Sequence, residues 1–348
     1  MQLPPASARL FLLLVPFCWG TYNPTLRLLY SLPSPPSPAE LSGVRLSVAL
    51  LPFLPVLLQA AWPREPELQP GEKPVADNTD WAAVRTASLE LGGFNLLGTA
   101  GQAWGLEHTS AVHAAVLLSS INVLVPVGAS ISGERVQPTT WLACALILLG
   151  IGLLNADVTD DSSQLAASAL QLSDGDAAVL FAALSYSAYT VRLSGYAKRV
   201  PALPLSAGKT AVLGAGCISW AIAEAIHNNI APAVPSATAA ASDASALWGG
   251  AGPDVTLIAW LCICFSALVP GSLATFLQAK GQSGVSAPEA QVILALTPVV
   301  SICIASVLLG ERIGPNVVQA ASVMLTASAI CVAADVRRLQ QNGGVEDS

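Results

Sequence analysis

The sequence predicts an all-α integral membrane protein of ten transmembrane helices, arranged as two inverted repeats of five helices each. Three observations carry this prediction: an apolar composition, a series of apolar runs of similar length, and a weak internal repeat. Of the 348 residues, 53% are hydrophobic and only 11% are charged. A soluble domain usually has about 25% charged residues, so this chain has too few charges to cover a globule in water.

Ten apolar runs are long enough to cross a bilayer, because a helix needs about 20 residues to span about 30 Å of hydrocarbon. A β-barrel would instead show segments of about ten residues with alternating polarity. The runs occupy residues 10–30, 41–61, 86–106, 111–132, 139–156, 176–196, 206–227, 255–278, 287–309 and 315–334.

Polar segments separate several of these runs and divide the chain. Residues 62–80 are rich in Pro and charge, residues 157–164 are acidic, and residues 231–250 are small and polar, so all three are expected to be solvent loops. The expected units are a first repeat at 1–156, an acidic linker at 157–175, a second repeat at 176–336 and a polar tail at 337–348.

The distribution of Lys and Arg predicts the orientation. With the N-terminus inside and the spans alternating, most basic residues fall on the inner side, while Arg45 and Lys209 are assigned to helix ends. The positive-inside rule therefore places both termini on the cytosolic or stromal side, and leaves open a plasma membrane or a plastid envelope. No cleavable presequence is expected, because the first apolar run is longer than a signal h-region.

The internal repeat has a period of roughly 170 residues. Gln102 aligns with Gln278, Tyr22 in "WGTYNP" aligns with Tyr189 in "YSAYTV", and the Gly-Glu-Arg at 133–135 aligns with that at 310–312. Both tripeptides end an apolar run shortly before a Pro, as expected for a tight turn at the membrane boundary. Because each copy has five spans, the second enters the membrane in the opposite sense. This plan is typical of secondary transporters with a solute site near the midplane.

These motifs resemble the drug/metabolite transporter superfamily, and its EamA family in particular. The resemblance rests on "FCWGTYNP" at 17–24, "YSAYTV" at 186–191 and "TPVVSICIASVLLGERIG" at 297–314. The first half departs from the family pattern, because Pro126 lies closer to Glu134 than expected and "SGER" replaces "LGE". The resemblance spans nearly the whole chain. It implies two EamA repeats of five helices and transport of a small organic metabolite by alternating access, and it does not identify the solute.

The resemblance also implies a central cavity lined by helices one, three, four, six, eight and nine. Carried onto this sequence, the substrate-binding candidates are Trp19, Tyr22, Asn23, Asn95, Gln102, Asn122, Tyr186, Tyr189, Gln278 and Gln291. Aromatic rings and amides can orient a polar solute without trapping it. The alternative interpretation is structural, because amides also join helices by hydrogen bonds and aromatic residues anchor at membrane interfaces.

Ionisable residues in apolar runs are candidates for function. His113 and Glu289 occupy equivalent repeat positions and could carry a coupling proton, although Glu289 also fits an ordinary helix start after Ser286. Arg192 could recognise an anion or extend to the inner surface. Because Arg192 is the one plausible cation in the expected cavity, a phosphorylated solute is disfavoured.

No metal, cofactor or nucleic-acid partner is expected. The 7 Cys form no CxxC pair, the 3 His form no HxxxH pair, and no phosphate-binding loop occurs. A membrane-embedded enzyme would need a catalytic cluster that the sequence lacks, whereas a non-transporting membrane scaffold stays an alternative. The expected partners are a small solute and the lipid bilayer. Small residues in the fifth and tenth runs indicate either a homodimer contact or internal packing.

Overall fold

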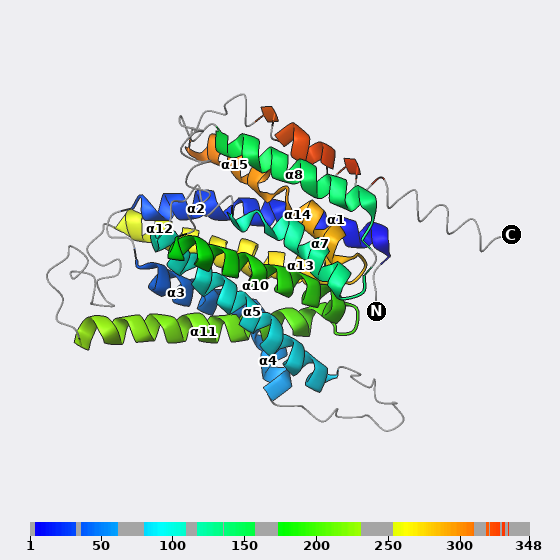
Figure 1. Ribbon diagram of the computed structural model, residues 1–348. Coiled ribbons are helices and arrows are strands. Elements are labelled where there is room, and N and C mark those ends of the chain that lie inside the picture. The colour runs from blue at the N-terminus through cyan, green and yellow to red at the C-terminus, as the bar shows by residue number, and fades with distance from the viewer. Residues whose placement is uncertain are drawn as a thin grey trace, which may run out of the picture.

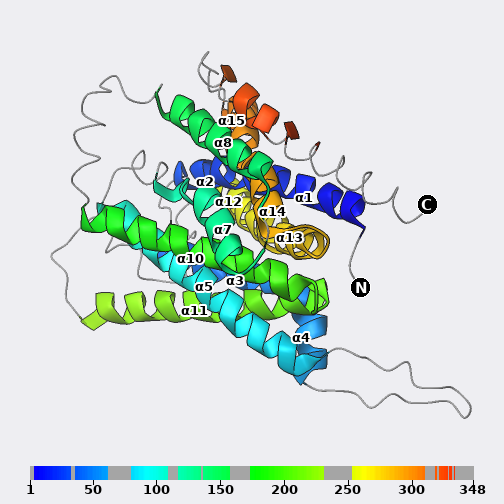
Figure 2. The ribbon, with the colours of Figure 1, turned by 45° about the vertical axis from the view of Figure 1, so that its right-hand side comes forward.

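The computed structural model describes residues 4–32, 36–61, 80–108, 117–134, 136–156, 173–230 and 253–309, together with short pieces between 318 and 333. The described residues form helices and no strands. Figure 1 shows the helices side by side in one bundle, and the turned view in Figure 2 keeps the same order, with α11 on one side and α8 and α15 on the other.

The helices occupy most of the runs expected from the sequence. They are α1 (Pro5–Gly20), α2 (Tyr22–Tyr30), α3 (Pro38–Leu50), α4 (Leu54–Ala61), α5 (Trp81–His108), α7 (Ile121–Ile131), α8 (Pro138–Ala156), α10 (Asp174–Ala197), α11 (Ala202–Ile230), α12 (Pro253–Ser266), α13 (Ala274–Gln282), α14 (Ala287–Leu294) and α15 (Thr297–Leu309). In the last expected run, 315–334, the described residues 321–327 are helical.

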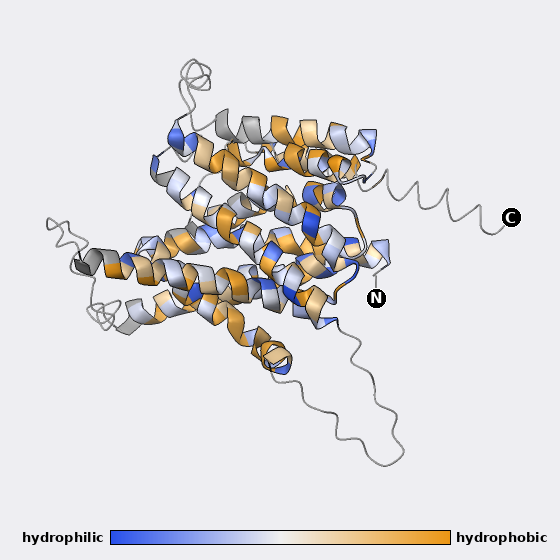
Figure 3. Ribbon diagram, turned by 60° about the horizontal axis from the view of Figure 1, so that its bottom comes forward, coloured by the Kyte–Doolittle hydropathy of each residue, from blue (hydrophilic) through white to orange (hydrophobic). Residues whose placement is uncertain are grey.

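Four described helical stretches are both long and apolar enough to cross a membrane: Pro38–Ala61, Ala202–Ile226, Thr256–Gln282 and Ala287–Leu308. Large apolar side chains are exposed on many helices, among them Leu10, Ile131 and Val307, which are 63%, 82% and 85% exposed. Figure 3 shows hydrophobic residues along the length of the helices. An apolar outer surface of this kind is suited to lipid and not to water.

Side-chain caps fix where several helices begin. Ser37 and Glu40 form a capping box at the start of α3, and Ser173 and Asp176 form one at the start of α10. In each box the serine hydroxyl accepts a hydrogen bond from the third backbone N–H, and the acidic side chain accepts one from the serine N–H. Asp80 caps α5, because its Oδ1 accepts from two backbone N–H groups at 3.0 Å.

Prolines interrupt runs that the sequence analysis treats as single helices. The run 10–30 is broken at Thr21, because Pro24 has no N–H to give to the carbonyl of Gly20. Pro298 likewise has no N–H to donate to the carbonyl of Leu294, and α14 and α15 are separate helices on either side of this position. The hydroxyl of Thr297 donates to that carbonyl instead, at 2.6 Å.

Two further runs change their helical pitch at a proline. A 3₁₀ turn, Leu51–Phe53, joins α3 and α4. A π-helical segment, Ala267–Leu273, contains Pro270 and joins α12 and α13. The hydroxyl of Ser272 lies in this segment and donates to the carbonyl of Ala49 in α3 at 2.6 Å.

The most extensive helix packing in the described residues is that of α5 against α10 and α11. A Cβ placed on Gly105 of α5 would lie 2.6 Å from Val179 Cγ2 and 2.9 Å from the Gly175 carbonyl oxygen of α10. Only glycine allows this approach, which brings the polar side chains of the two helices onto one cavity.

Candidate functional site

A cavity of about 590 Å³ lies between the helices of the two halves. This volume is in the usual range for a site that holds a small molecule, about 300–1,000 Å³. Nine of the ten substrate-binding candidates line it: Trp19, Tyr22, Asn23, Asn95, Gln102, Tyr186, Tyr189, Gln278 and Gln291. The tenth, Asn122, is not among the lining residues and is 5% exposed.

Two of the three tyrosines of α10 place glutamines at the cavity wall. The hydroxyl of Tyr186 donates to Gln102 Oε1 at 3.1 Å and lies 3.3 Å from the hydroxyl of Thr99. The hydroxyl of Tyr189 donates to Gln278 Oε1 at 3.0 Å. One helix of the second half therefore orients both members of the glutamine pair that the repeat relates.

A single amide pair joins α7 to α14. Gln291 Nε2 donates to Asn122 Oδ1 at 3.1 Å, and Asn122 Nδ2 donates to the carbonyl of Ser119 at 3.0 Å. Asn122 thus contacts the cavity only through Gln291, which is itself a lining residue. Its described contacts are those of a positioning residue and not of a direct solute ligand.

The indole of Trp19 is held by the irregular backbone around Pro270. Trp19 Nε1 donates to the Pro270 carbonyl at 3.1 Å, and both residues line the cavity. Pro270 lies within the π-helical segment Ala267–Leu273, where the backbone departs from the α-helical hydrogen-bond pattern. The sequence signal for this feature is a proline inside an apolar run.

Two basic residues that the sequence analysis assigned to helix ends also line the cavity. Arg45 Cζ lies 4.9 Å from the centre of the Tyr22 ring, and Lys209 Nζ lies 4.5 Å from the centre of the Tyr189 ring. Lys209 is 3% exposed and also donates a hydrogen bond to the hydroxyl of Tyr189. The assignment of both residues to helix ends was wrong, because α3 begins at Pro38 and α11 at Ala202, so that each residue lies about two turns inside its helix.

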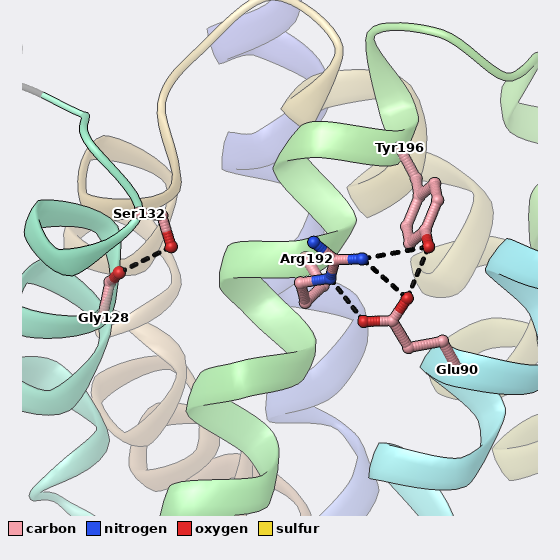
Figure 4. Close-up of polar contacts among 5 residues, drawn as sticks. All are labelled: Glu90, Gly128, Ser132, Arg192 and Tyr196. Atoms are coloured by element: carbon pink, nitrogen blue, oxygen red, sulfur yellow. Dashed lines mark hydrogen bonds and ion pairs between the residues drawn. The ribbon is translucent and has the colours of Figure 1, made fainter.

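Arg192 is not among the residues that line the cavity. Its guanidinium donates to both carboxylate oxygens of Glu90 in α5, one of them at 2.8 Å, and to the hydroxyl of Tyr196 at 3.1 Å. The hydroxyl of Tyr196 in turn donates to Glu90, so the three side chains form a closed network (Figure 4). The expectation that Arg192 is the cation of the cavity was therefore wrong, because the guanidinium of Arg192 is already paired with the carboxylate of Glu90.

Of the two proton-coupling candidates, one lies outside the described residues and the other lies away from the cavity lining. His113 lies outside the described residues. Glu289 is not among the lining residues: its Oε1 accepts from Arg9 Nε at 2.6 Å, and both side chains are about nine-tenths buried. Ser286 caps α14 and accepts from the Glu289 N–H at 3.4 Å, as the helix-start interpretation requires.

Metal ligands do not cluster in the part of the chain that the structure describes. No group of three or more His, Cys, Asp or Glu side chains there could hold a metal ion. Six cysteines are described as free thiols, and four of them are buried among apolar side chains.

Three comparisons with known proteins bear on identity. A search of the curated proteins found no significant match. One solved crystal structure of a protein is similar to this one over 96% of this chain and 99% of the other, with a TM-score of 0.63 and 16% sequence identity, which shows a shared fold. The sequence profile of the EamA-like transporter family matches residues 6–156 and again residues 174–333. Because the two matches cover most of the chain, this protein belongs to the EamA-like transporter family of the drug/metabolite transporter superfamily.

Proposed function

We propose that this protein carries a small organic metabolite across a membrane by alternating access around the cavity. The family is one of membrane transporters, so the chain is an integral multi-pass membrane protein whose setting is a lipid bilayer. The proposal takes the two matched regions as two inverted repeats of five spans each, with the linker at 157–175 between them and both termini on the cytosolic or stromal side.

The observation that carries the proposal is the origin of the cavity wall. Tyr22 and Gln102 belong to the first matched region, and Tyr189 and Gln278 belong to the second. A site whose walls come from both halves changes shape when the halves move relative to each other, which alternating access requires. A scaffold without transport activity would have no use for such a cavity.

The two ends of the cavity differ, and this difference supports a conformation open to one side. At one end the lining includes Asn23, Tyr30 and Pro38, which are exposed, so the cavity reaches the surface there. With both termini inside, this end faces outward, because the loop after α2 is the first outer loop.

The inner end is closed by packing. Ala8 and Leu12 of α1 form an apolar cluster with Val285, Ala290 and Ile293, and a Cβ on Gly281 would lie 2.5 Å from Leu12 Cγ. The buried pair Arg9–Glu289 lies at the same end and joins α1 to α14. Opening the inner side requires separation of these contacts.

A counterflow experiment tests the proposal. Purified protein is reconstituted into liposomes preloaded with one unlabelled solute, and uptake of the same solute in radiolabelled form is followed, with and without a pH gradient. We expect saturable exchange of at least one solute class that protein-free liposomes lack. Absence of exchange for every solute, combined with turnover of a substrate, would support an enzyme; saturable binding of another protein without flux would support a scaffold.

The inverted repeat has its own test. The proposal places positions 135 and 312, which lie outside the described residues, on opposite sides of the membrane. Arg135→Cys and Arg312→Cys variants are labelled with a membrane-impermeant maleimide from each side, with the unsubstituted protein as the background control. Labelling of both positions from the same side would refute the inverted arrangement.

A further inference from the structure

We propose that the transported solute is an organic anion, and that Arg45 and Lys209 bind its carboxylate or phosphate group. This inference rests on the proposed transport function and adds the chemical class of the solute. The observation behind it is that the described residues that line the cavity include two basic side chains, one from each half, and no acidic side chain.

The two cations occupy corresponding places in the two halves. Tyr22 and Tyr189 are aligned by the repeat, and each has a basic side chain beside it: Arg45 Cζ lies 4.9 Å and Lys209 Nζ lies 4.5 Å from the centre of the respective ring. The basic residue comes from the next span of the same half in both cases, α3 for Arg45 and α11 for Lys209.

The sequence around the two cations repeats as well. Residues 42–48 read "SGVRLSV" and residues 206–212 read "SAGKTAV", which share the pattern Ser-x-x-basic-x-x-Val. A basic side chain beside a tyrosine is therefore present in both halves at equivalent positions, which a chance surface charge would not produce.

Neither cation has an acidic partner among the described residues. The described ion pairs join Arg9 to Glu289, Arg192 to Glu90 and Lys198 to Glu134. The ammonium of Lys209 has three donors, and only the hydroxyl of Tyr189 is a described acceptor for it. Lys209 is nevertheless 3% exposed.

A buried cation without a counter-ion is costly, and such residues in membrane proteins are rare unless they serve a function. A solute anion that enters the cavity would supply the missing charge and accept the unused hydrogen bonds. Bidentate bonds from a guanidinium and a charge-assisted bond from an ammonium are suited to the oxygens of a carboxylate or a phosphate. The indole of Trp19 and the rings of Tyr22 and Tyr186 would contact the less polar part of the solute.

The first test uses the unsubstituted protein and pairs of solutes in which one member carries the anionic group and the other lacks it. Counterflow is measured with succinate against succinamide for the carboxylate arm and with glycerol 3-phosphate against glycerol for the phosphate arm, within a panel of other small carboxylates, phosphate esters, neutral solutes and amines. We expect exchange of anions of one or both arms to be at least about tenfold faster than that of their neutral partners. The arm that responds identifies the anionic group.

The second test removes the cations one at a time. Lys209→Gln and Arg45→Gln should each lower anion exchange about thirtyfold or more, because each removes a buried charged contact to the solute. Lys209→Arg and Arg45→Lys keep the charge and should retain more exchange than the glutamine variants. Lys198→Gln and Arg199→Gln change exposed cations outside the cavity lining and should stay within about twofold of the unsubstituted protein.

Three outcomes are decisive. Exchange limited to neutral or cationic solutes would overturn this inference and leave the transport function standing. Anion exchange that survives both glutamine variants, whose folding is checked by gel filtration and melting temperature, would also overturn it. Failure of every solute class to exchange would overturn the transport function itself, and this inference with it.

Discussion

Substitution of Gly98 tests how tightly the cavity wall is built. Gly98 lies on α5 with its backbone against the ring of Tyr186, and a Cβ placed there would lie 2.6 Å from Tyr186 Cε1 and 2.8 Å from Cδ1 and Cζ. The ring cannot easily retreat, because its hydroxyl is bonded to Gln102 at 3.1 Å and lies 3.3 Å from the Thr99 hydroxyl.

The same helix offers a matched control. Nothing lies within 4 Å of a Cβ placed on Gly93, so Gly93→Ala changes only the backbone preference of α5. Alanine in a helix interior is favoured over glycine by about 0.5–1 kcal/mol. Gly98→Ala gains the same helix preference, but overpacking lowers its free energy of unfolding by about 1–3 kcal/mol, because the Tyr186 ring and α5 must both shift.

The difference in the free energy of unfolding between the two variants is therefore expected to be about 1–3 kcal/mol in favour of Gly93→Ala. Reversible unfolding in mixed detergent micelles measures this difference in stability. Counterflow measures the loss of solute exchange that we expect when the hydroxyl of Tyr186 is displaced. Equal stability of the two variants would refute the close contact between α5 and the ring.

Three further sets of substitutions test contacts around the cavity. Arg9→Met or Glu289→Gln alone should lower the free energy of unfolding by about 3–5 kcal/mol, because each removes one partner of a buried ion pair, and the double variant should lose less than the sum; a double-mutant cycle with no coupling would contradict this. Asn122→Ala and Gln291→Ala should show a coupling of about 0.6–2 kcal/mol in the same unfolding assay, and additive effects would argue against their hydrogen bond. Trp19→Phe replaces the indole with a smaller aromatic ring that cannot donate to the backbone carbonyl, so it should cost at least about 1 kcal/mol in that assay, and an unchanged stability would argue against the bond.

The parts of the site that the sequence predicts are those with a local signal. Gln102, Gln278, Tyr22 and Tyr189 could be selected because polar residues in apolar runs are costly and because the repeat aligns them in pairs. The structure places all four at the cavity. Their roles as solute ligands stay a prediction, since three of them also make the hydrogen bonds between helices that the structural interpretation expects.

The basic residues of the cavity could not be located in the same way. Hydropathy places span boundaries only within several residues, and a Lys or Arg near a boundary is normally read as a membrane-surface residue. Arg45 and Lys209 were both assigned on that basis. Arg192 was wrongly expected at the cavity. Its partner Glu90 lies 102 residues away in sequence, so no local pattern predicts that the two residues pair.

The helix breaks show a similar limit. Proline predicts that a helix is disturbed, but tertiary contacts decide the form that the disturbance takes. Pro126 stays inside α7, Pro24 separates α1 from α2, and Pro270 lies in a π-helical segment whose carbonyl accepts from Trp19. The same residue type therefore lies within a continuous helix, at a break and in a change of helical pitch, and the sequence alone does not distinguish these outcomes.

The unequal burial of the two cations has a consequence for the transport cycle. Arg45 is half-buried and its half of the cavity includes the exposed mouth, whereas Lys209 is 3% exposed. If the repeats are inverted copies, the conformation open to the other side is obtained by exchanging the environments of the two halves. Lys209 would then lie near the new mouth and Arg45 would be enclosed. In both conformations, an anion bound between the two residues would contact one accessible cation and one enclosed cation. The charge of the anion would therefore stay balanced while the site opens to the other side of the membrane.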